Sequence, residues 1–474
     1  MKGKIDNLTG MTIVSESGKK YTLKEIIGSG SQGIVYEDNS EKFVIKFYYP
    51  AESEMLDMER LERISFIKDI EIPRNFVAIQ DVISEPNVGY VMEKVADHKP
   101  LNSYLIPDKH KEFIEWYNDG LGFRERLVIG YIIAKAFSDL ENNNFSYCDI
   151  SGNNILINTV KNASVRLIDV DNIYIAGRGN AAILGTPRYI APEVISRQKN
   201  PDVLSDNYSL AVILFELLRV GHPYISDDVL DGTPEMEDEA LAGKYPYVNE
   251  DNSTNMLPED LVLTDKLKEL FRKCFVDGQK NRIRRPSAYE FEKALLEASN
   301  SVIKCSECGA WHYIISEGDE KGKCPWCGAD SKGDKKLEFY DVLYDGKEYR
   351  KDAEIVSIKL VSTYILRSGM NYIKELYVLR YDDISKDSRT VGNYFTIQNR
   401  SEGYIACNEF SKNVYLYSRD RNYKFLKIPS GRAIDLKLGD ELFFEVDGAE
   451  KAEIECGGTK YSFIRMAKFV EVAE

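Results

Sequence analysis

The sequence predicts an α+β protein in which a large mixed region is followed by a short cysteine-rich segment and an all-β region. Up to about residue 300, segments with strand signals alternate with segments whose apolar residues recur at helical spacing. Four of the eight cysteines then fall in two Cys-x2-Cys pairs. From about residue 337 the chain consists of short runs rich in aromatic and β-branched residues. At 474 residues the chain is too long for one hydrophobic core, so we expect domains at 1–300, 301–332 and 333–474.

Composition and charge argue against several classes of partner. The net charge of −15 argues against nucleic acid, because phosphate backbones bind clusters of Lys and Arg. No uncharged apolar run reaches 18 residues, and residues 1–10 are polar. We therefore expect a cytoplasmic protein with no membrane partner. The acidic stretch 226–240 is expected to be a solvated surface loop.

The elements of the first region follow from periodicity. Strands are expected at 21–27 and 43–48, and amphipathic helices at 55–67 and 123–140. Residues 207–218 are apolar almost all round, which predicts a buried helix. Two more helices are expected, one with Leu267, Leu270, Phe271 and Cys274 on its apolar face, and one that begins at a capping box formed by Ser287 and Glu290.

A glycine-rich segment, "GSGSQGIVY", runs from Gly28 to Tyr36. Its Gly-x-Gly-x-x-Gly pattern lets a backbone approach phosphates closely, although alone it also fits a Rossmann turn or an ordinary loop. The residues that follow, "IVYED", favour a strand, whereas a Rossmann glycine loop opens a helix. A strand–loop–strand hairpin is the arrangement that covers the nucleotide in protein kinases.

Further motifs follow in an order that resembles the protein kinase superfamily over residues 10–300. Lys46 lies on a strand thirteen residues after Gly33. The segment "SYCDISGNNILIN" contains Asp149 and Asn154, and "LIDVD" places Asp169 fifteen residues further on. Each motif alone is weak, but the complete ordered set is specific. The resemblance implies a two-lobed kinase fold, with a small lobe at 10–95 and a large lobe at 96–300.

The resemblance implies a site for ATP and Mg²⁺. Asp149 would orient the substrate hydroxyl, Asn154 and Asp169 would hold Mg²⁺, and Lys46 would complete the catalytic set. Lys46 would pair with Glu59 of the acidic helix, with Glu62 as an open alternative. Nucleotide contacts would come from Gly28, Gly30, Gly33, Val35, Lys46, Glu59, Met92 behind the adenine, the backbone at Glu93 and Val95, Asn154 and Asp169.

The segment "LGTPRYIAPE" at 184–193 resembles the part of a kinase that closes the activation loop and builds the platform for a protein substrate. The resemblance implies an ion pair between Glu193 and Arg285. Asp206 would bond the backbone of the catalytic loop. Thr186 would contact the catalytic Asp149.

Several residues depart from the family pattern. Cys148 precedes Asp149 where the family has Arg, and that Arg normally pairs with a phosphate on the activation loop. Between Asp169 and Gly185 the chain has no Ser or Thr and one Tyr, Tyr174. Because the Arg and the phosphorylation sites are missing together, we expect a kinase that does not require loop phosphorylation. Asp171 replaces the Gly of Asp-Phe-Gly, and Ser151 replaces a Lys that contacts the γ-phosphate.

The two Cys-x2-Cys pairs are separated by fifteen residues, and each is followed by Gly. Four thiolates complete a tetrahedral zinc site and leave no open position for catalysis, so a structural zinc ribbon is expected; iron–sulfur ligation is the alternative. His312 is close in sequence but is not required. The ligands are Cys305, Cys308, Cys324 and Cys327. The remaining cysteines, Cys148, Cys274, Cys407 and Cys456, are expected to be reduced thiols.

The β region is predicted to form a sandwich or barrel. Its segment at 431–446 resembles the final strands of forkhead-associated domains, which read phosphothreonine through an Arg and a Ser-x-x-His pair. The last histidine of the chain is His312, so that pair is absent. We therefore expect an interaction or regulatory module.

Together these observations predict a cytoplasmic, bacterial-type, Mg·ATP-dependent protein serine/threonine kinase. Its partners would be a protein substrate and a partner phosphatase or regulatory protein. The alternatives are a nucleotide-binding pseudokinase scaffold and an interaction protein in which all three domains bind partners. A kinase of small molecules is disfavoured by the "GTPRYIAPE" segment.

Overall fold

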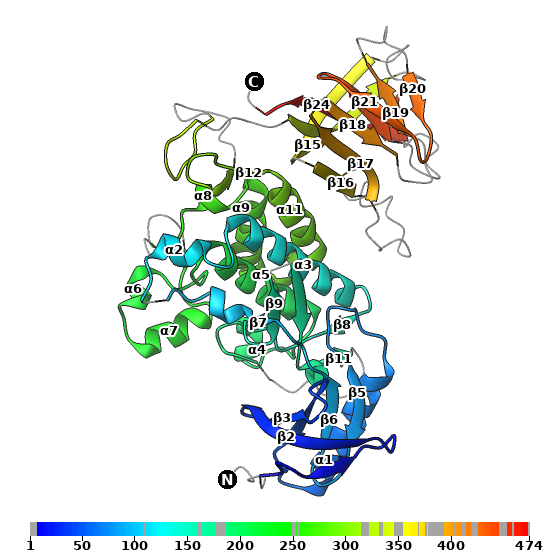
Figure 1. Ribbon diagram of the computed structural model, residues 1–474. Coiled ribbons are helices and arrows are strands. Elements are labelled where there is room, and N and C mark those ends of the chain that lie inside the picture. Colours follow the sequence, from blue (N-terminus) through cyan, green and yellow to red (C-terminus); the bar gives the residue numbers. More distant parts are fainter. Residues whose placement is uncertain are drawn as a thin grey trace. The chain divides into compact units, whose positions relative to one another are not determined.

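The computed structural model forms two compact units, Met1–Leu295 and Leu296–Glu474 (Figure 1). The cysteine-rich segment belongs to the second unit together with the β region. Among the described residues, no helix combines the length and apolar character needed to cross a membrane. The structure describes residues 7–108, 110–159, 163–175, 185–248, 253, 256–313, 322–330, 335–345, 354–367, 369–374, 377, 393–401, 403–408, 414–418, 425–444, 453–456 and 459–472.

The first unit begins with a six-stranded antiparallel sheet in the spatial order β1-β2-β3-β4-β6-β5. On β4, Ile45 and Phe47 join an apolar core cluster on one face of the sheet. Because side chains alternate along a strand, Lys46 and Tyr48 lie on the opposite face. The strands are β1 (Thr12–Val14), β2 (Lys20–Ser29), β3 (Gly33–Asp38), β4 (Phe43–Tyr48), β5 (Ile79–Ile83) and β6 (Gly89–Glu93).

Helix α1 (Glu54–Asp69) connects β4 to β5 and lies against β5 (Figure 1). It begins where the Ser53 side chain accepts a hydrogen bond from the backbone N–H of Leu56. Ile64 and Ile67 are its buried residues. The helix predicted at 55–67 is therefore confirmed, as is the strand predicted at 43–48.

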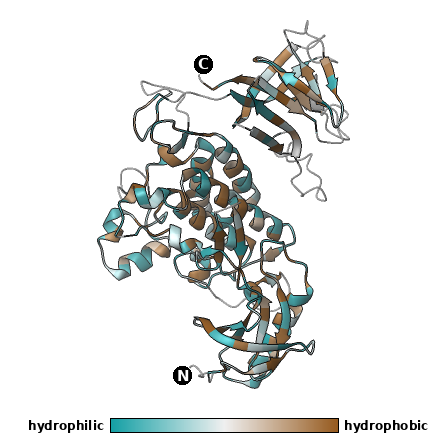
Figure 2. Ribbon diagram, in the orientation of Figure 1, coloured by the Kyte–Doolittle hydropathy of each residue, from teal (hydrophilic) through white to brown (hydrophobic). Residues whose placement is uncertain are grey.

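The rest of the first unit is mainly helical, and its hydrophobic residues gather on the helices at its centre (Figure 2). Helix α5 (Val203–Arg219) is buried almost all round, as its composition predicts, and begins at a capping box between Asp202 and Ser205. The other elements are β7 (Lys99–Pro100), η1 (Leu101–Tyr104), α2 (Phe113–Asn118), α3 (Phe123–Glu141), β8 (Phe145–Ser146), β9 (Ile155–Asn158), β10 (Ser164–Leu167), η2 (Val170–Asn172), β11 (Tyr174–Ile175), α4 (Pro192–Ile195), α6 (Asp227–Leu230), α7 (Pro234–Leu241), α8 (Glu259–Val262), α9 (Asp265–Arg272), the π-helical η3 (Lys273–Asp277), α10 (Gly278–Lys280), η4 (Arg282–Arg284) and α11 (Ala288–Asn300).

Two local expectations have different outcomes. The capping box predicted at Ser287 is confirmed: its Oγ lies 3.3 Å from the backbone N of Glu290, whose carboxylate accepts the Ser287 N–H at 2.9 Å. The prediction of a loop at 226–240 is wrong, because this stretch contains helices α6 and α7. Pro234 opens α7 and acidic residues occupy its first turn, both of which stabilise a helix N-terminus.

Apart from the end of α11, the named elements that the structure describes in the second unit are strands. A seven-stranded sheet has the order β15-β14-β24-β22-β19-β20, with β23 paired to β24, and a four-stranded sheet has the order β16-β17-β18-β21. Phe395 of one sheet stacks on Phe444 of the other with ring centroids 5.2 Å apart, so the sheets face each other. The strands are β12 (Val302–Lys304), β13 (Trp311–Tyr313), β14 (Lys335–Asp345), β15 (Glu354–Ile365), β16 (Gly369–Lys374), β17 (Asn393–Arg400), β18 (Gly403–Cys407), β19 (Val414–Tyr417), β20 (Phe425–Ile428), β21 (Ala433–Leu436), β22 (Glu441–Phe444), β23 (Glu453–Cys456) and β24 (Thr459–Glu471).

The first unit contains a buried histidine, His222. His222 is 1% exposed, and its Nδ1 accepts the backbone N–H of Tyr224 at 3.2 Å. The ring proton is therefore on Nε2, which donates to the Arg188 carbonyl at 3.0 Å. Burial, together with the Arg188 charge, lowers the pKa of His222 to about 3.

We predict that His222 contributes to loss of stability between pH 6.5 and pH 5. The unfolded chain takes up a proton on this residue near pH 6.5 and the folded chain does not, so acid favours unfolding. The free energy of unfolding should fall by about 2 kcal/mol over this interval because of His222, at about 1.4 kcal/mol per pH unit. Hydrogen exchange of α5 in urea should show a smaller acid-induced loss in His222→Gln. Equal losses in both proteins would contradict the prediction.

Candidate active site

The catalytic-loop segment is fixed to helix α5 by one carboxylate. Asp206 accepts the backbone N–H of Tyr147 at 2.5 Å and that of Cys148 at 3.1 Å, as predicted. The Tyr147 hydroxyl donates to the carbonyl of Ile168. Its ring packs against Phe76 and Phe137, with centroids 5.5 and 5.8 Å away. The loop is thereby joined both to the helical core and to the segment that precedes Asp169.

Asn154 and Asp169 meet because their strands pair. Ile155 at the start of β9 lies opposite Leu167 at the end of β10, so the residues just outside these two strands lie at the same end. The Ile168 N–H donates to the Asn154 carbonyl at 3.0 Å. The Asn154 side-chain amide donates to the Asp149 carbonyl at 3.0 Å, which leaves the amide oxygen as a candidate metal ligand. The structure therefore brings together Asp149, Asn154 and Asp169, the three residues predicted to lie at the site.

Lys46 lies beside this trio, but with different partners from those expected. Its Nζ is 3.2 Å from Asp169 Oδ1 and 3.2 Å from Asp171 Oδ2. The predicted partners on α1, Glu59 and Glu62, both have exposed side chains. The predicted pairing of Lys46 with Glu59 is therefore corrected in this structure to an ion pair with two aspartates.

Asp171 is a residue beside Lys46 that the sequence reasoning did not place in the site. Its side chain is 2% exposed, and both Tyr48 and Tyr90 donate hydrogen bonds to it. Although burial opposes the effect, Lys46 and the two hydroxyl groups keep the pKa of Asp171 below its ordinary value. The sequence did contain a signal for this contact, because Asp171 is an acidic residue at the position where the family motif Asp-Phe-Gly has Gly.

The charges of the site fit a divalent cation. Three carboxylates, those of Asp149, Asp169 and Asp171, lie near the ammonium group of Lys46. Burial, then the Asp169 charge, raises the pKa of Asp149 to about 6. Burial and the Asp171 charge likewise raise the pKa of Asp169, although Lys46 opposes them. Carboxylate and amide oxygens are the ligands that Mg²⁺ uses, and positive charge here would relieve the repulsion.

The three glycines of the β2–β3 hairpin have two different roles. A Cβ at Gly33 would lie 1.9 Å from the Phe47 carbonyl oxygen of β4, so only glycine allows these strands to pack. A Cβ at Gly30 would meet nothing within 4 Å, and at Gly28 the nearest atom would be Val35 Cβ at 3.7 Å. Space for a ligand therefore exists at Gly28 and Gly30. Contacts of these residues with a nucleotide stay a prediction.

The residues expected at the adenine site occupy the end of β6. Met92 is 4% exposed and lies in this strand. Glu93 is its last residue, with an exposed side chain 3.5 Å from Arg166. Val95 follows and is half-buried. Their roles toward adenine remain predictions.

The structure describes residues 185–193 of the segment that is expected to form the substrate platform. Glu193 and Arg285 form the predicted ion pair through two hydrogen bonds of 2.7 and 2.8 Å. Thr186 is exposed, and its carbonyl accepts the N–H of Tyr189. Tyr174 lies in β11, opposite Ser146 of β8. The activation-loop residues 176–184 lie outside the described residues.

The four predicted zinc ligands converge in the second unit. The Sγ atoms of Cys305, Cys308, Cys324 and Cys327 all lie within 4.8 Å of one another. The two pairs form equivalent turns: Gly309 N–H donates to the Cys305 carbonyl at 3.0 Å and Gly328 N–H to the Cys324 carbonyl at 2.8 Å. The Cys308 backbone N–H lowers the pKa of the Cys305 thiol to about 7. Four converging thiols of this kind fit a tetrahedral metal.

His312 is not part of this cluster. It is 1% exposed, with Nδ1 2.7 Å from the Tyr313 carbonyl. Outside the cluster, Cys148, Cys274 and Cys407 are free thiols, as expected. The Cys456 side chain lies outside the described residues.

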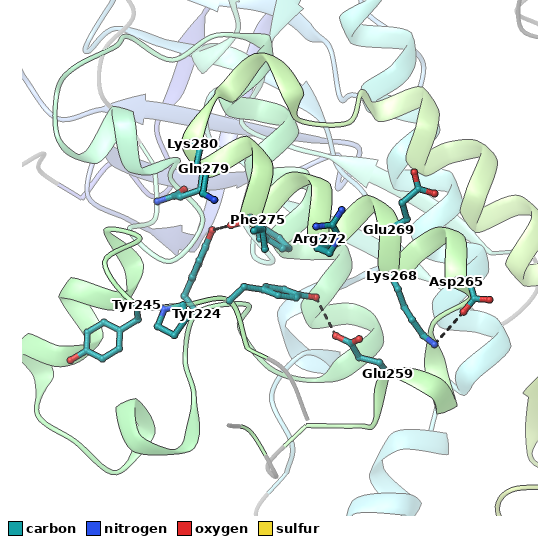
Figure 3. Close-up of a pocket in the computed structure, with 13 residues that line it drawn as sticks. Tyr224, Tyr245, Glu259, Asp265, Lys268, Glu269, Arg272, Phe275, Gln279 and Lys280 are labelled. Carbon is teal, nitrogen blue, oxygen red and sulfur yellow. Dashed lines mark hydrogen bonds and ion pairs between the residues drawn. The ribbon is translucent and has the colours of Figure 1, made fainter. Parts of the chain in front are cut away.

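A cavity of about 740 Å³ lies elsewhere in the first unit (Figure 3). None of the predicted catalytic residues lines it. Some of its polar groups bond one another: the Tyr224 hydroxyl donates to the Phe275 carbonyl at 2.7 Å, and Lys268 pairs with Asp265 at 3.4 Å. We therefore place the chemistry at Asp149 rather than in this cavity.

The first unit combines the glycine-containing β2–β3 hairpin, a buried lysine on β4, and polar residues at one end of the β9–β10 pair. This combination is typical of the two-lobed fold of nucleotide-dependent phosphotransferases. Residues 21–294, more than half of the chain, match the sequence model of the protein kinase domain. The chain belongs to the protein kinase family.

Curated relatives agree with this assignment. A probable serine/threonine-protein kinase of Dictyostelium discoideum is 27% identical over 45% of this chain and 39% of its own length. The serine/threonine-protein kinase fused of Drosophila melanogaster is 24% identical over 55% of this chain and 32% of its own. The Arabidopsis thaliana kinase CTR1 is 29% identical over 43% and 24%. The chain spans less than half the length of these relatives. All three are eukaryotic, so they do not support the expected bacterial origin.

Proposed function

We propose that this chain is an ATP- and Mg²⁺-dependent protein serine/threonine kinase. The observation that carries the proposal is the meeting of Asp149, Asn154, Asp169 and Lys46 at one end of the β9–β10 pair, within a protein kinase fold. The relatives named above carry the serine/threonine designation.

Each residue has a distinct role in the proposed reaction. Bound Mg·ATP would supply the phosphoryl group and the positive charge that stabilises its transfer. Asp149 would accept a hydrogen bond from the substrate hydroxyl and orient it toward the phosphoryl group. Asn154 and Asp169 would hold the metal through their side-chain oxygens. Lys46 would bind phosphate oxygens.

The substrate of a protein kinase is a protein, and the ion pair beneath the platform supports this choice. Arg285 is buried and holds Glu193 in a two-bond geometry, which fixes the segment after the activation loop. A rigid surface of this kind suits a polypeptide better than a small molecule. A partner phosphatase or regulatory protein fits the second unit as an interaction module.

We predict that Asp149→Asn and Asp169→Asn each lower phosphotransfer from labelled ATP by about a hundredfold or more, because positioning and charge stabilisation contribute effects of this size. Asp149→Asn should leave nucleotide affinity nearly unchanged, whereas Asp169→Asn should weaken Mg²⁺-dependent binding. Asp139→Asn is a matched control, since this acid on α3 pairs with Lys135 away from the site. Phosphotransfer that survives both active-site changes would favour the pseudokinase scaffold.

We further propose that the activation loop needs no phosphate. In kinases with Arg before the catalytic Asp, that charge requires a phosphate partner before the loop orders. Cys148 removes the charge, and burial raises the pKa of its thiol well above the ordinary value, so the thiol stays neutral. Tyr174 is the one hydroxyl residue between Asp169 and Gly185.

The corresponding experiment compares phosphatase-treated with untreated protein, and Tyr174→Phe with wild type. Activity should change little in either comparison. The residue immediately before Asp149 is the neutral Cys148, so no positive charge there needs a phosphate partner. Mass spectrometry before and after treatment serves as the control for complete dephosphorylation. A large loss of activity in either comparison would show that loop phosphorylation matters.

We also propose that the cysteine cluster binds one structural Zn²⁺ per chain. Metal analysis should find about one zinc per chain in wild type and in the control Cys407→Ser, and much less in Cys305→Ser/Cys308→Ser. Loss of metal should increase hydrogen exchange in β12 and β13, because the binding energy is also folding energy for such a segment. Retention of zinc by the double variant would refute this ligand set.

A further inference from the structure

The side chain of Asp171 has a complete set of donors. Its Oδ1 accepts the Tyr90 hydroxyl at 2.9 Å, and its Oδ2 accepts the Tyr48 hydroxyl at 2.5 Å. Lys46 Nζ lies 3.3 and 3.2 Å from the same two oxygens. Each oxygen therefore receives one neutral and one charged donor, which fixes the rotation of the carboxylate as well as its position.

These donors are rigid because they share one face of the small-lobe sheet. Lys46 and Tyr48 are two residues apart on β4, so they point the same way. Lys46 lies directly opposite Tyr90 of β6 in the strand register. Tyr90 is fully buried and Tyr48 is 7% exposed. The pocket that receives Asp171 is therefore formed by regular strands rather than by a loop.

Helix α1 does not compete for Lys46. Glu59 and Glu62 are exposed. Arg60 of the helix lies near Tyr48, with its guanidinium carbon 5.5 Å from the centre of the ring, and it pairs with Asp57 of the same helix at 3.0 Å. Arg60 also donates to the carbonyl of Tyr49 at 2.9 Å. The structure therefore pairs Lys46 with Asp169 and Asp171 and leaves both helix glutamates exposed.

We propose that Asp171 is the positioning residue for Lys46, in the place that a helix glutamate takes in the protein kinase pattern. The inference rests on one part of the proposed function, namely that Lys46 binds nucleotide phosphates, and it does not require turnover. Lys46 contacts two carboxylates, and Asp169 is the one assigned to the metal. Asp171, held by two tyrosine hydroxyls, is the partner that remains for the ammonium group. The lysine is thus positioned by the segment that carries the metal ligand, not by α1.

The test measures binding of a non-hydrolysable ATP analogue with Mg²⁺ to the full chain by calorimetry, so that no turnover is required. Asp171→Asn should raise the dissociation constant about tenfold, because removing one partner of a buried charged pair displaces the other. Lys46→Met should have a similar effect. In the Lys46→Met background, Asp171→Asn should add little, since a residue that acts through the lysine has no effect without it.

Two sets of variants separate positioning from a general loss of structure. Asp171→Glu keeps the charge and should recover part of the affinity, while Glu54→Gln on α1 controls for loss of one negative charge. Tyr48→Phe/Tyr90→Phe keeps both rings and removes the two hydroxyl donors. It should weaken binding in the same direction, and it provides the test if Asp171→Asn does not fold.

Other outcomes would overturn the inference. Unchanged or tighter binding by Asp171→Asn would mean that Asp171 is unnecessary or that it sequesters Lys46. Additive losses in the double variant would assign Asp171 a role independent of the lysine. A loss confined to Glu59→Gln would return the role to α1. Because binding is measured without turnover, a chain that lacks phosphotransfer activity but shows the coupled loss would refute the proposed function and retain this inference.

Discussion

The active-site geometry depends on the buried carboxylate of Asp206. It lies in the first turn of α5, where the helix N-terminus favours negative charge, and it accepts two consecutive backbone N–H groups of the catalytic loop. Asp149 is the next residue after those two. A helix embedded in the large-lobe core therefore determines where Asp149 lies, and the loop has little freedom of its own.

A second connection runs from Tyr147 to Ile168, and it joins the two halves of the proposed metal site. A tyrosine at this position reaches the carbonyl directly while its ring fills space beside Phe76 and Phe137. Asn154 and Asp169 are then held by strand pairing at the ends of β9 and β10. Backbone geometry, rather than side-chain flexibility, sets the separation of these oxygens.

The sequence predicted the elements well where local chemistry decides them. Periodicity located α1, a nearly continuous apolar composition located α5, and the capping box at Ser287 located the start of α11. The prediction of a loop at 226–240 was wrong. The acidic residues of this stretch are typical of an exposed loop, but acidic residues also stabilise the first turn of a helix. Motif order located Asp149, Asn154 and Asp169, because their spacing reflects a strand pair that the local sequence already encodes.

The partner of Lys46 was not predictable in the same way. Lys46 and Asp171 are 125 residues apart, and the choice among acidic residues depends on which carboxylate the folded sheet faces. Two acids on α1 fitted the expected pattern, and Glu59 was preferred only slightly over Glu62. The two tyrosines that complete the Asp171 site lie on β4 and β6, and they share one partner only because these strands pair in the folded sheet.

The packing of Gly33 has an evolutionary consequence. Its missing side chain makes room for the Phe47 carbonyl, so the requirement for glycine comes from the contact between two strands and exists with or without nucleotide. Gly28 and Gly30 carry no such steric requirement. Under the proposed function, a descendant of this chain that no longer bound ATP would be free to replace those two glycines while selection for folding kept Gly33. The last glycine of the motif records the architecture of the small lobe, whereas the first two would record the nucleotide of the proposed function.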